Sequence, residues 1–206
     1  MTLKIYGVAR SRAFRTLWIA KELGLDYEHI KIDFATGETR TQAHLALNPN
    51  GHVPVIDDDG LILWESMAIN LYLAKKYSAA RLYPTRLEDE ARAWQWSFGG
   101  MTEVERPVLT ALFNRAILPE NERDPAAADA AEKTLAQPLK VLDGALERSS
   151  YLLGDRFTVA DLNVASILAW ARPAQIDFAA FPKVAEWSRN CAERPAARAA
   201  RQLQRE

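Results

Sequence analysis

The sequence predicts an α/β domain at residues 1–78 and an all-helical domain at residues 86–206. Three observations support this division. The chain opens on a strand-helix-strand pattern, a hairpin pattern surrounds residue 58, and no segment after residue 86 alternates apolar and polar side chains. A chain of 206 residues is long enough for one or two domains, each with its own core.

The first 34 residues predict a strand, a helix and a second strand. Residues 2–6 alternate in polarity, and apolar residues then recur at helical spacing from Ser11 to Leu23, with Gly24 as a C-terminal cap. Residues 27–34 again look like a strand. This compact order predicts a right-handed unit with two parallel strands.

A hairpin and a helix follow. Aliphatic residues flank Asp58-Asp59-Gly60, which predicts two antiparallel strands and a tight turn with a positive φ at Gly60. We expect the aspartates of this turn, Asp57 to Asp59, to be solvated and to form no metal site. With a mildly helical stretch before residue 47 and the apolar helix ESMAINLYLAKKY, the order becomes βαβαββα. That is the thioredoxin-like arrangement, although the pattern alone also admits other small α/β folds.

The second half is expected to be helical throughout, after a linker at residues 77–84. Residues 87–118 have a helical period that Gly99-Gly100 and Pro107 should bend. A second long helix is expected at residues 126–148.

A third helix of this half should begin at Thr158. The run Thr158-Val159-Ala160-Asp161 has the spacing of a capping box, with Asp in place of the usual Glu. Two short helices should begin near Pro182 and Pro195.

Composition excludes several classes of protein. A net charge of −1 gives no basic excess for binding nucleic acid through phosphates. The single cysteine, Cys191, excludes an internal disulfide and a zinc site of paired cysteines. No run approaches 18 apolar residues and no charged-then-apolar leader opens the chain, so a cytoplasmic protein without membrane contact is expected.

Two short runs predict a binding site for a small extended peptide. Pro54 removes one donor from its strand, which leaves the backbone of Val53 free to pair with a peptide, and a cis bond here would present Val53 outward. At the next helix start, the amide and hydroxyl of Ser66 suit a carboxylate, while Glu65 suits an ammonium group. An α-amino-acid head group carries both charges.

These residues carry a family resemblance. VPVI followed by WESMAI resembles the glutathione-binding half of the cytosolic glutathione S-transferases, and the similarity in length, linker and helical half extends over the whole chain. The resemblance implies a bacterial-type transferase of detoxification that binds glutathione as co-substrate through His52, Val53, Pro54, Glu65 and Ser66. It also implies a homodimer and a hydrophobic electrophile bound with help from the helical domain.

The resemblance leaves the residue that stabilises the glutathione thiolate open among Ser11, Tyr6 and Arg10. Family members of the Ser type place the working residue about five positions after an aromatic that ends the first strand, and Ser11 has that spacing from Tyr6. A hydroxyl at a helix N-terminus can donate to a thiolate. Ser11 is therefore the favoured catalytic residue, with an ordinary helix cap as its alternative role.

His52 is the candidate for the glycyl carboxylate of glutathione, with Arg40 as a second candidate and an exposed loop histidine as the plain alternative. His29 and His44 lack such a context and are expected on the surface. Phe98 and Glu105 are among the residues expected to line the electrophile site.

Two other functions are compatible with this scaffold. One is glutathione-dependent reduction of disulfides or peroxides, or isomerisation, on the same site. The other is a non-catalytic binding protein, which usually loses parts of the glutathione clamp.

Overall fold

In the computed structural model, which describes residues 2–78 and 82–205, the chain forms two compact units. The first comprises Met1–Tyr83 together with Glu193–Glu206, and the second comprises Pro84–Ala192. The sequence-based division places residues 193–206 in the helical domain, whereas in the structure this segment belongs to the first unit. The predicted linker falls partly on residues 79–81, outside the described residues.

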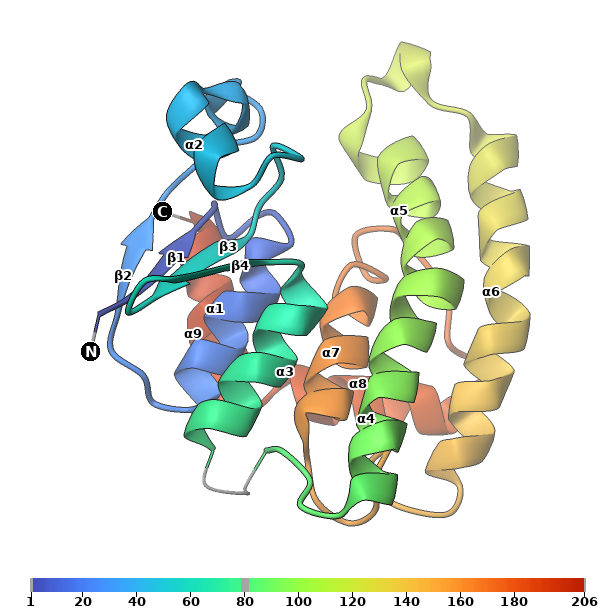
Figure 1. The fold of residues 1–206 in the computed structure, drawn as a ribbon. Coiled ribbons are helices and arrows are strands. Elements are labelled where there is room, and N and C mark those ends of the chain that lie inside the picture. The colour runs from blue at the N-terminus through green and yellow to red at the C-terminus, as the bar shows by residue number, and fades with distance from the viewer. Residues whose placement is uncertain (1, 79–81, 206) are drawn as a thin grey trace. The chain divides into compact units, whose positions relative to one another are not determined.

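The first unit has the predicted thioredoxin-like order, which confirms the fold class. Its elements are β1 (Leu3–Tyr6), α1 (Ala13–Glu22), β2 (Tyr27–Ile30), α2 (Gln42–Leu47), β3 (Val55–Asp58), β4 (Leu61–Trp64), α3 (Ser66–Tyr77) and, from the chain's end, α9 (Pro195–Gln202). Strand β2 ends at Ile30, four residues earlier than the pattern suggests. Figure 1 shows α1, α3 and α9 on one side of the sheet and α2 on the other.

The sheet has the strand order β2-β1-β3-β4, with β1 and β2 parallel and the other two pairs antiparallel. Tyr6 lies opposite both Ile30 and Val55, and Val55 lies opposite Trp64. The last residues of β1, β2 and β4 therefore lie side by side with the first residue of β3, at one end of the strands.

Helix α1 is the core of the first unit. Every residue from Ala13 to Ala20 is buried, because α3, α9 and β1 all pack against this helix. Its buried face includes Arg15, a charged residue with no exposed surface.

The second unit is all-helical, as predicted. Its α-helices are α4 (Leu87–Gly99), α5 (Arg106–Leu112), α6 (Pro125–Leu146), α7 (Val159–Leu168) and α8 (Pro182–Ala192). A π-helical segment, Gly100–Glu105, joins α4 to α5, and Figure 1 shows α5 beside α6. Pro107, one residue into α5, has no N–H to donate to the preceding turn, which explains why the helix widens where the sequence predicts a bend.

Helix α7 is the buried centre of the second unit, and the predicted capping box at its start is present. Asp161 accepts hydrogen bonds from the backbone N–H of Thr158 at 2.9 Å and of Leu152 at 2.8 Å. It also accepts one from the indole Nε1 of Trp187 at 3.0 Å. This carboxylate thus fixes the helix start, a neighbouring loop and α8 together.

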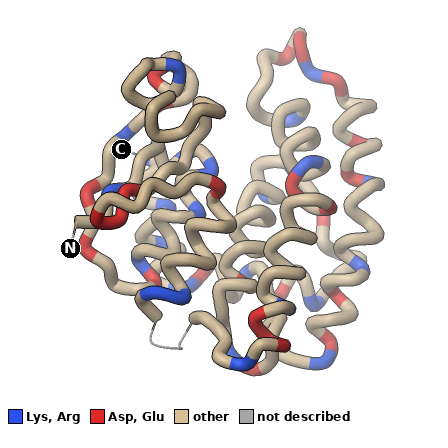
Figure 2. Tube along the Cα trace, in the orientation of Figure 1, with Lys and Arg blue, Asp and Glu red and all other residues tan. Residues whose placement is uncertain are grey.

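Charges of both signs are interspersed over each unit, as expected at a net charge of −1 (Figure 2). None of the helices in the described ranges is both long and apolar enough to cross a membrane.

Candidate functional site

Three segments meet at the end of the sheet where Tyr6, Val55 and Trp64 lie side by side. The register puts the loop after Tyr6, the segment before Val55 and the turn after Trp64 at this same end of the sheet. These segments carry Ser11, Val53-Pro54 and Glu65-Ser66, respectively. The fold therefore brings the predicted site residues of the first unit to one place.

Gly7 shows how closely two of these segments approach. Its φ is +126°, and a Cβ atom built on it would lie 2.8 Å from the Cβ of Val53 and 2.9 Å from the Cβ of Ala13. Only glycine fits this conformation and this space. The first loop, the start of α1 and the Val53 segment are consequently in direct contact.

The Val53-Pro54 peptide bond is cis, as the sequence expectation allows. The side chain of Val53 is buried against Gly7. In the described part of the chain, no recorded hydrogen bond uses the backbone N–H or carbonyl of Val53. These two backbone groups are therefore available to an extended peptide that pairs with Val53.

Glu65 has an unusual backbone conformation at the start of α3. Its φ is +73° and its ψ is 110°, and its side chain makes no cap hydrogen bond. A non-glycine residue with positive φ is uncommon, and such residues cluster where a ligand is held. Glu65 is exposed, so its carboxylate is open to a cationic group.

Ser66 faces the interior. It is 3% exposed, and its Oγ accepts a hydrogen bond from Nη1 of the buried Arg15 at 3.2 Å. Arg15 was not predicted as a site residue, although a lone arginine within the apolar run of α1 was a visible signal. The backbone amide of Ser66 keeps its place in the first turn of α3, where N–H groups attract a carboxylate.

Ser11 is nearly buried and makes local hydrogen bonds. Its Oγ donates to the carbonyl of Val8 at 2.7 Å and accepts from the N–H of Ala13 at 3.1 Å. This is the geometry of a helix-initiating turn, which is the alternative role foreseen for the residue. Of the other two thiolate candidates, Arg10 is exposed and pairs with Asp33, while Tyr6 is half-buried at the end of β1.

His44 is buried, so its expected place on the surface is wrong. It is 3% exposed, and its Nε2 lies 3.0 Å from the carbonyl oxygen of His52. His29 is half-buried and its Nε2 lies 2.8 Å from the carbonyl of Gly7. The ring of His52 itself is exposed. Arg40 donates to the carbonyl of Asn50 at 3.3 Å, in the turn before His52.

In the helical unit, the residues expected to contact an electrophile differ in exposure. Phe98 on α4 is 60% exposed, whereas Glu105 is buried. Glu105 therefore does not offer a free carboxylate on the surface of this unit.

Comparisons with known proteins point to one family. Residues 1–75 match the family described as "Glutathione S-transferase, N-terminal domain", and residues 103–195 match "Glutathione S-transferase, C-terminal domain". The chain is 33% identical to "Glutathione S-transferase GstB" of Escherichia coli strain K12, with 89% of each chain covered. It is 36% identical to "Glutathione S-transferase 3" of Zea mays, with 94% of this chain and 90% of the maize protein covered.

Solved structures give the same result. A theta class glutathione S-transferase from Xanthomonas axonopodis pv. citri with glutathione bound has a TM-score of 0.90 and 33% identity, with 96% of each chain covered. A glutathione S-transferase-I bound with lactoylglutathione has a TM-score of 0.88 and 32% identity, with 98% of this chain and 99% of that chain covered.

Proposed function

The chain belongs to the glutathione S-transferase family, and we propose that its first unit binds glutathione along Val53 and at the start of α3 while Ser11 stabilises the thiolate. At the level of the family, its activity is conjugation of the glutathione thiol to electrophiles, with glutathione as co-substrate. The observation that carries the proposal is that three segments meet at one end of the sheet. In the described residues, the backbone N–H and carbonyl of Val53 there make no hydrogen bond within the protein.

Each part of glutathione has a complementary group in this arrangement. The cysteinyl backbone pairs with the backbone of Val53, the γ-glutamyl ammonium binds the exposed carboxylate of Glu65, and the γ-glutamyl carboxylate binds the first-turn amide of Ser66. Pro54 shapes the segment beside Val53. His52, whose ring is exposed, binds the glycyl carboxylate.

The chemical step needs sulfur as an anion, because an unperturbed thiol titrates near pH ~8.5 and is mostly protonated at neutral pH. Ser11 supplies a hydroxyl donor when its proton turns from the Val8 carbonyl toward the sulfur. The thiol proton leaves to solvent, the thiolate forms a bond to the electrophilic carbon, and the leaving group departs with its electron pair.

We expect Ser11→Ala to lower kcat with a halogenated aromatic substrate by about ten- to a hundredfold, the effect of losing one hydrogen bond to a charged atom. The Kd for glutathione, measured by isothermal titration calorimetry, should stay within about threefold. A pH titration of the thiolate absorbance in the complex should show a higher pKa for the bound thiol.

Ser11→Thr is the matched control, because it keeps a hydroxyl at the same place. An unchanged kcat in Ser11→Ala would remove Ser11 from the role and direct the same test to Tyr6→Phe and Arg10→Ala. If the unaltered protein fails to bind glutathione at millimolar concentration, the chain is a non-catalytic member of the family.

The second substrate, the assembly and the location of the protein are part of the same proposal. A hydrophobic electrophile, to which exposed Phe98 contributes contact area, is the second substrate. A homodimer and a cytoplasmic location are proposed from family membership, and sedimentation analysis of the purified protein measures the first.

A further inference from the structure

His44 is a buried residue that contacts the backbone of the proposed glutathione site. It is the third residue of α2 and is buried, and its Nε2 lies 3.0 Å from the carbonyl oxygen of His52. Asn48, just after α2, donates to the same oxygen through its Nδ2 at 2.9 Å. Both lone pairs of the His52 carbonyl are thus occupied by side chains from residues 44–48.

The contact fixes the tautomer of His44. A carbonyl oxygen can only accept, so Nε2 carries a hydrogen, and in the neutral ring Nδ1 is then an acceptor. Nδ1 is buried and has no hydrogen-bond partner in the part of the chain that the structure describes. An unsatisfied buried acceptor costs free energy that an apolar ring of the same shape would avoid. What an imidazole adds at this position is therefore its bond to His52.

The bonded carbonyl belongs to the peptide unit that also contains the N–H of Val53. This unit is planar and trans, so its C=O and N–H point in opposite directions. Two donors that hold the C=O toward α2 consequently hold the N–H of Val53 away from α2. No recorded bond within the described residues uses that N–H.

We propose that His44 is a positioning residue for glutathione: its Nε2–H, together with Asn48, sets the direction of the Val53 amide that pairs with the tripeptide backbone. The inference rests on the proposed function of the Val53 edge. Fixing this peptide unit before the ligand arrives reduces the ordering that binding would otherwise require.

His44 offers a cleaner test than Asn48. Asn48 also accepts from the N–H of Asn50 through its side chain, and its carbonyl accepts from the N–H of Gly51, so its replacement would disturb the whole turn. Within residues 2–78 and 82–205, the His44 ring makes one hydrogen bond, the one to His52.

The experiment uses His44→Phe in the full chain, with glutathione as the probe. We expect the KM and Kd for glutathione to rise about five- to tenfold, while kcat at saturating glutathione changes less than about twofold. The reason is that the lost interaction stabilises bound glutathione equally in the ground state and the transition state. His44→Gln places an amide N–H near the position of Nε2 and should restore both constants to within about twofold.

Thr41→Ala is the control for a merely structural effect. Thr41 caps α2 by accepting from the N–H of His44 at 3.3 Å, so its loss should lower the Tm but leave the KM for glutathione unchanged. If His44→Phe does not fold, His44→Asn, whose amide is too short to reach His52, takes its place with the same expected rise.

An unchanged KM and Kd in a folded His44→Phe or His44→Asn variant would overturn the inference. So would an equal rise in Thr41→Ala, or a failure of His44→Gln to restore binding. Failure of the proposed function is distinguishable, because then the unaltered protein itself would not bind glutathione.

Discussion

Asp58 is a buried carboxylate at the end of β3 with three donors from α3. Its oxygens accept from the hydroxyls of Tyr72 and Tyr77, each at 2.7 Å, and from Nζ of Lys76 at 2.8 Å. Burial acts to raise the pKa of Asp58, but these hydrogen bonds outweigh it, and the pKa lies below its ordinary value.

We expect Asp58→Asn to reduce the free energy of unfolding of the first unit by about 1–3 kcal/mol at pH 7, because three donors lose a charged acceptor. A folded-state pKa below the unfolded value means that this stabilisation is present above about pH 4 and is lost as the pH falls through the folded pKa. The difference between wild type and variant in urea unfolding should therefore be constant near neutral pH and shrink as the pH falls below about 4.

Asp59→Asn is the matched control one residue away. Asp59 is exposed with φ +52°, a conformation that Asn tolerates, so its replacement should change stability by less than about 0.5 kcal/mol at any pH. A constant difference between Asp58→Asn and wild type across the acid range would contradict the assignment of an ionised, hydrogen-bonded carboxylate.

The solvated hairpin tip predicted from three consecutive aspartates is wrong for Asp58. A signal was present, because side chains alternate along a strand and Asp58 shares a face with buried Ile56. The partners on α3 could not be predicted from the pattern. Likewise, nothing in the sequence around His44 indicates that its ring reaches His52, since that contact depends on how the turn at residues 48–51 folds back.

Among the elements, those with a local cause were predictable. The capping box at Thr158 and Asp161 needs only four residues, and the bend near Pro107 follows from a missing N–H. The hairpin and the positive φ of Gly60 follow from the turn residues. The positive φ of Glu65 was not predictable, because a non-glycine residue seldom adopts it and no turn motif surrounds it.

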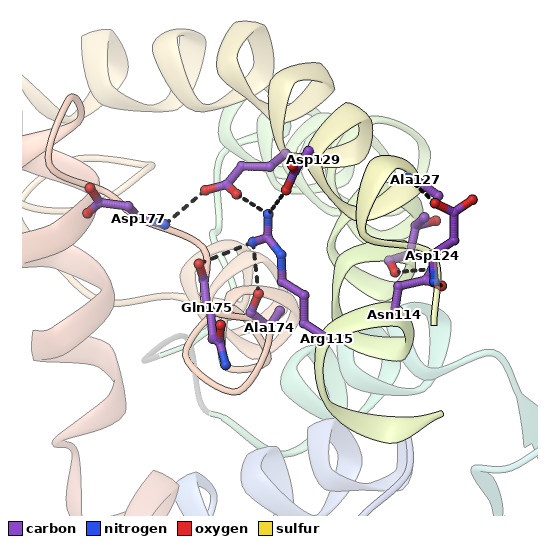
Figure 3. A network of polar contacts seen from close by, with 10 residues as sticks. Asn114, Arg115, Asp124, Ala127, Asp129, Ala174, Gln175 and Asp177 are labelled. Atoms are coloured by element: carbon purple, nitrogen blue, oxygen red, sulfur yellow. Dashed lines mark hydrogen bonds and ion pairs between the residues drawn. The ribbon is translucent and has the colours of Figure 1, made fainter. Parts of the chain in front are cut away.

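Arg115 joins three elements of the helical unit (Figure 3). Its Nη2 binds Asp129 at 2.9 Å and Glu132 at 2.6 Å, both on α6. Its Nη1 donates to the carbonyls of Ala174 at 3.1 Å and Gln175 at 3.2 Å. One planar guanidinium thus ties the π-helical segment Phe113–Ile117, which follows α5, to α6 and to the loop before α8.

We expect Arg115→Ala to lower the free energy of unfolding of the helical unit by about 1–3 kcal/mol, because four acceptors lose their donor. Arg115→Lys should recover less than half of this, since an ammonium group lacks the fork that serves carboxylates and carbonyls together. Thermal and urea unfolding measure both variants.

Arg92→Ala is the control for a surface ion pair. Arg92 is exposed and pairs with Asp89 on its own helix, so its loss should cost less than about 0.5 kcal/mol. Equal effects of Arg92→Ala and Arg115→Ala would show that the Arg115 contacts contribute no more than an exposed pair.

At the scale of the whole chain, the first unit is discontinuous. Helix α9 packs on α1, and Arg194 donates from Nε and Nη2 to the carboxylate of Glu22 at 2.6 and 2.8 Å. Gln204 donates to the carbonyl of Ala9 in the first loop at 3.2 Å. Periodicity identifies α9 as a helix, but no local pattern indicates which part of the chain it packs against.

Deletion of residues 193–206 should therefore destabilise the thioredoxin-like unit, although the deleted segment follows the helical unit in the chain. Residues 13–20 of α1 are buried on all faces, and exposing two of their apolar side chains costs on the order of 3–6 kcal/mol, a large part of the stability of a typical domain. Hydrogen exchange should show faster exchange in α1 and β1, with protection in α6 and α7 retained. Arg194→Ala, which keeps α9, should show a smaller effect confined to the end of α1, whereas faster exchange in the helical unit alone would place α9 with that unit.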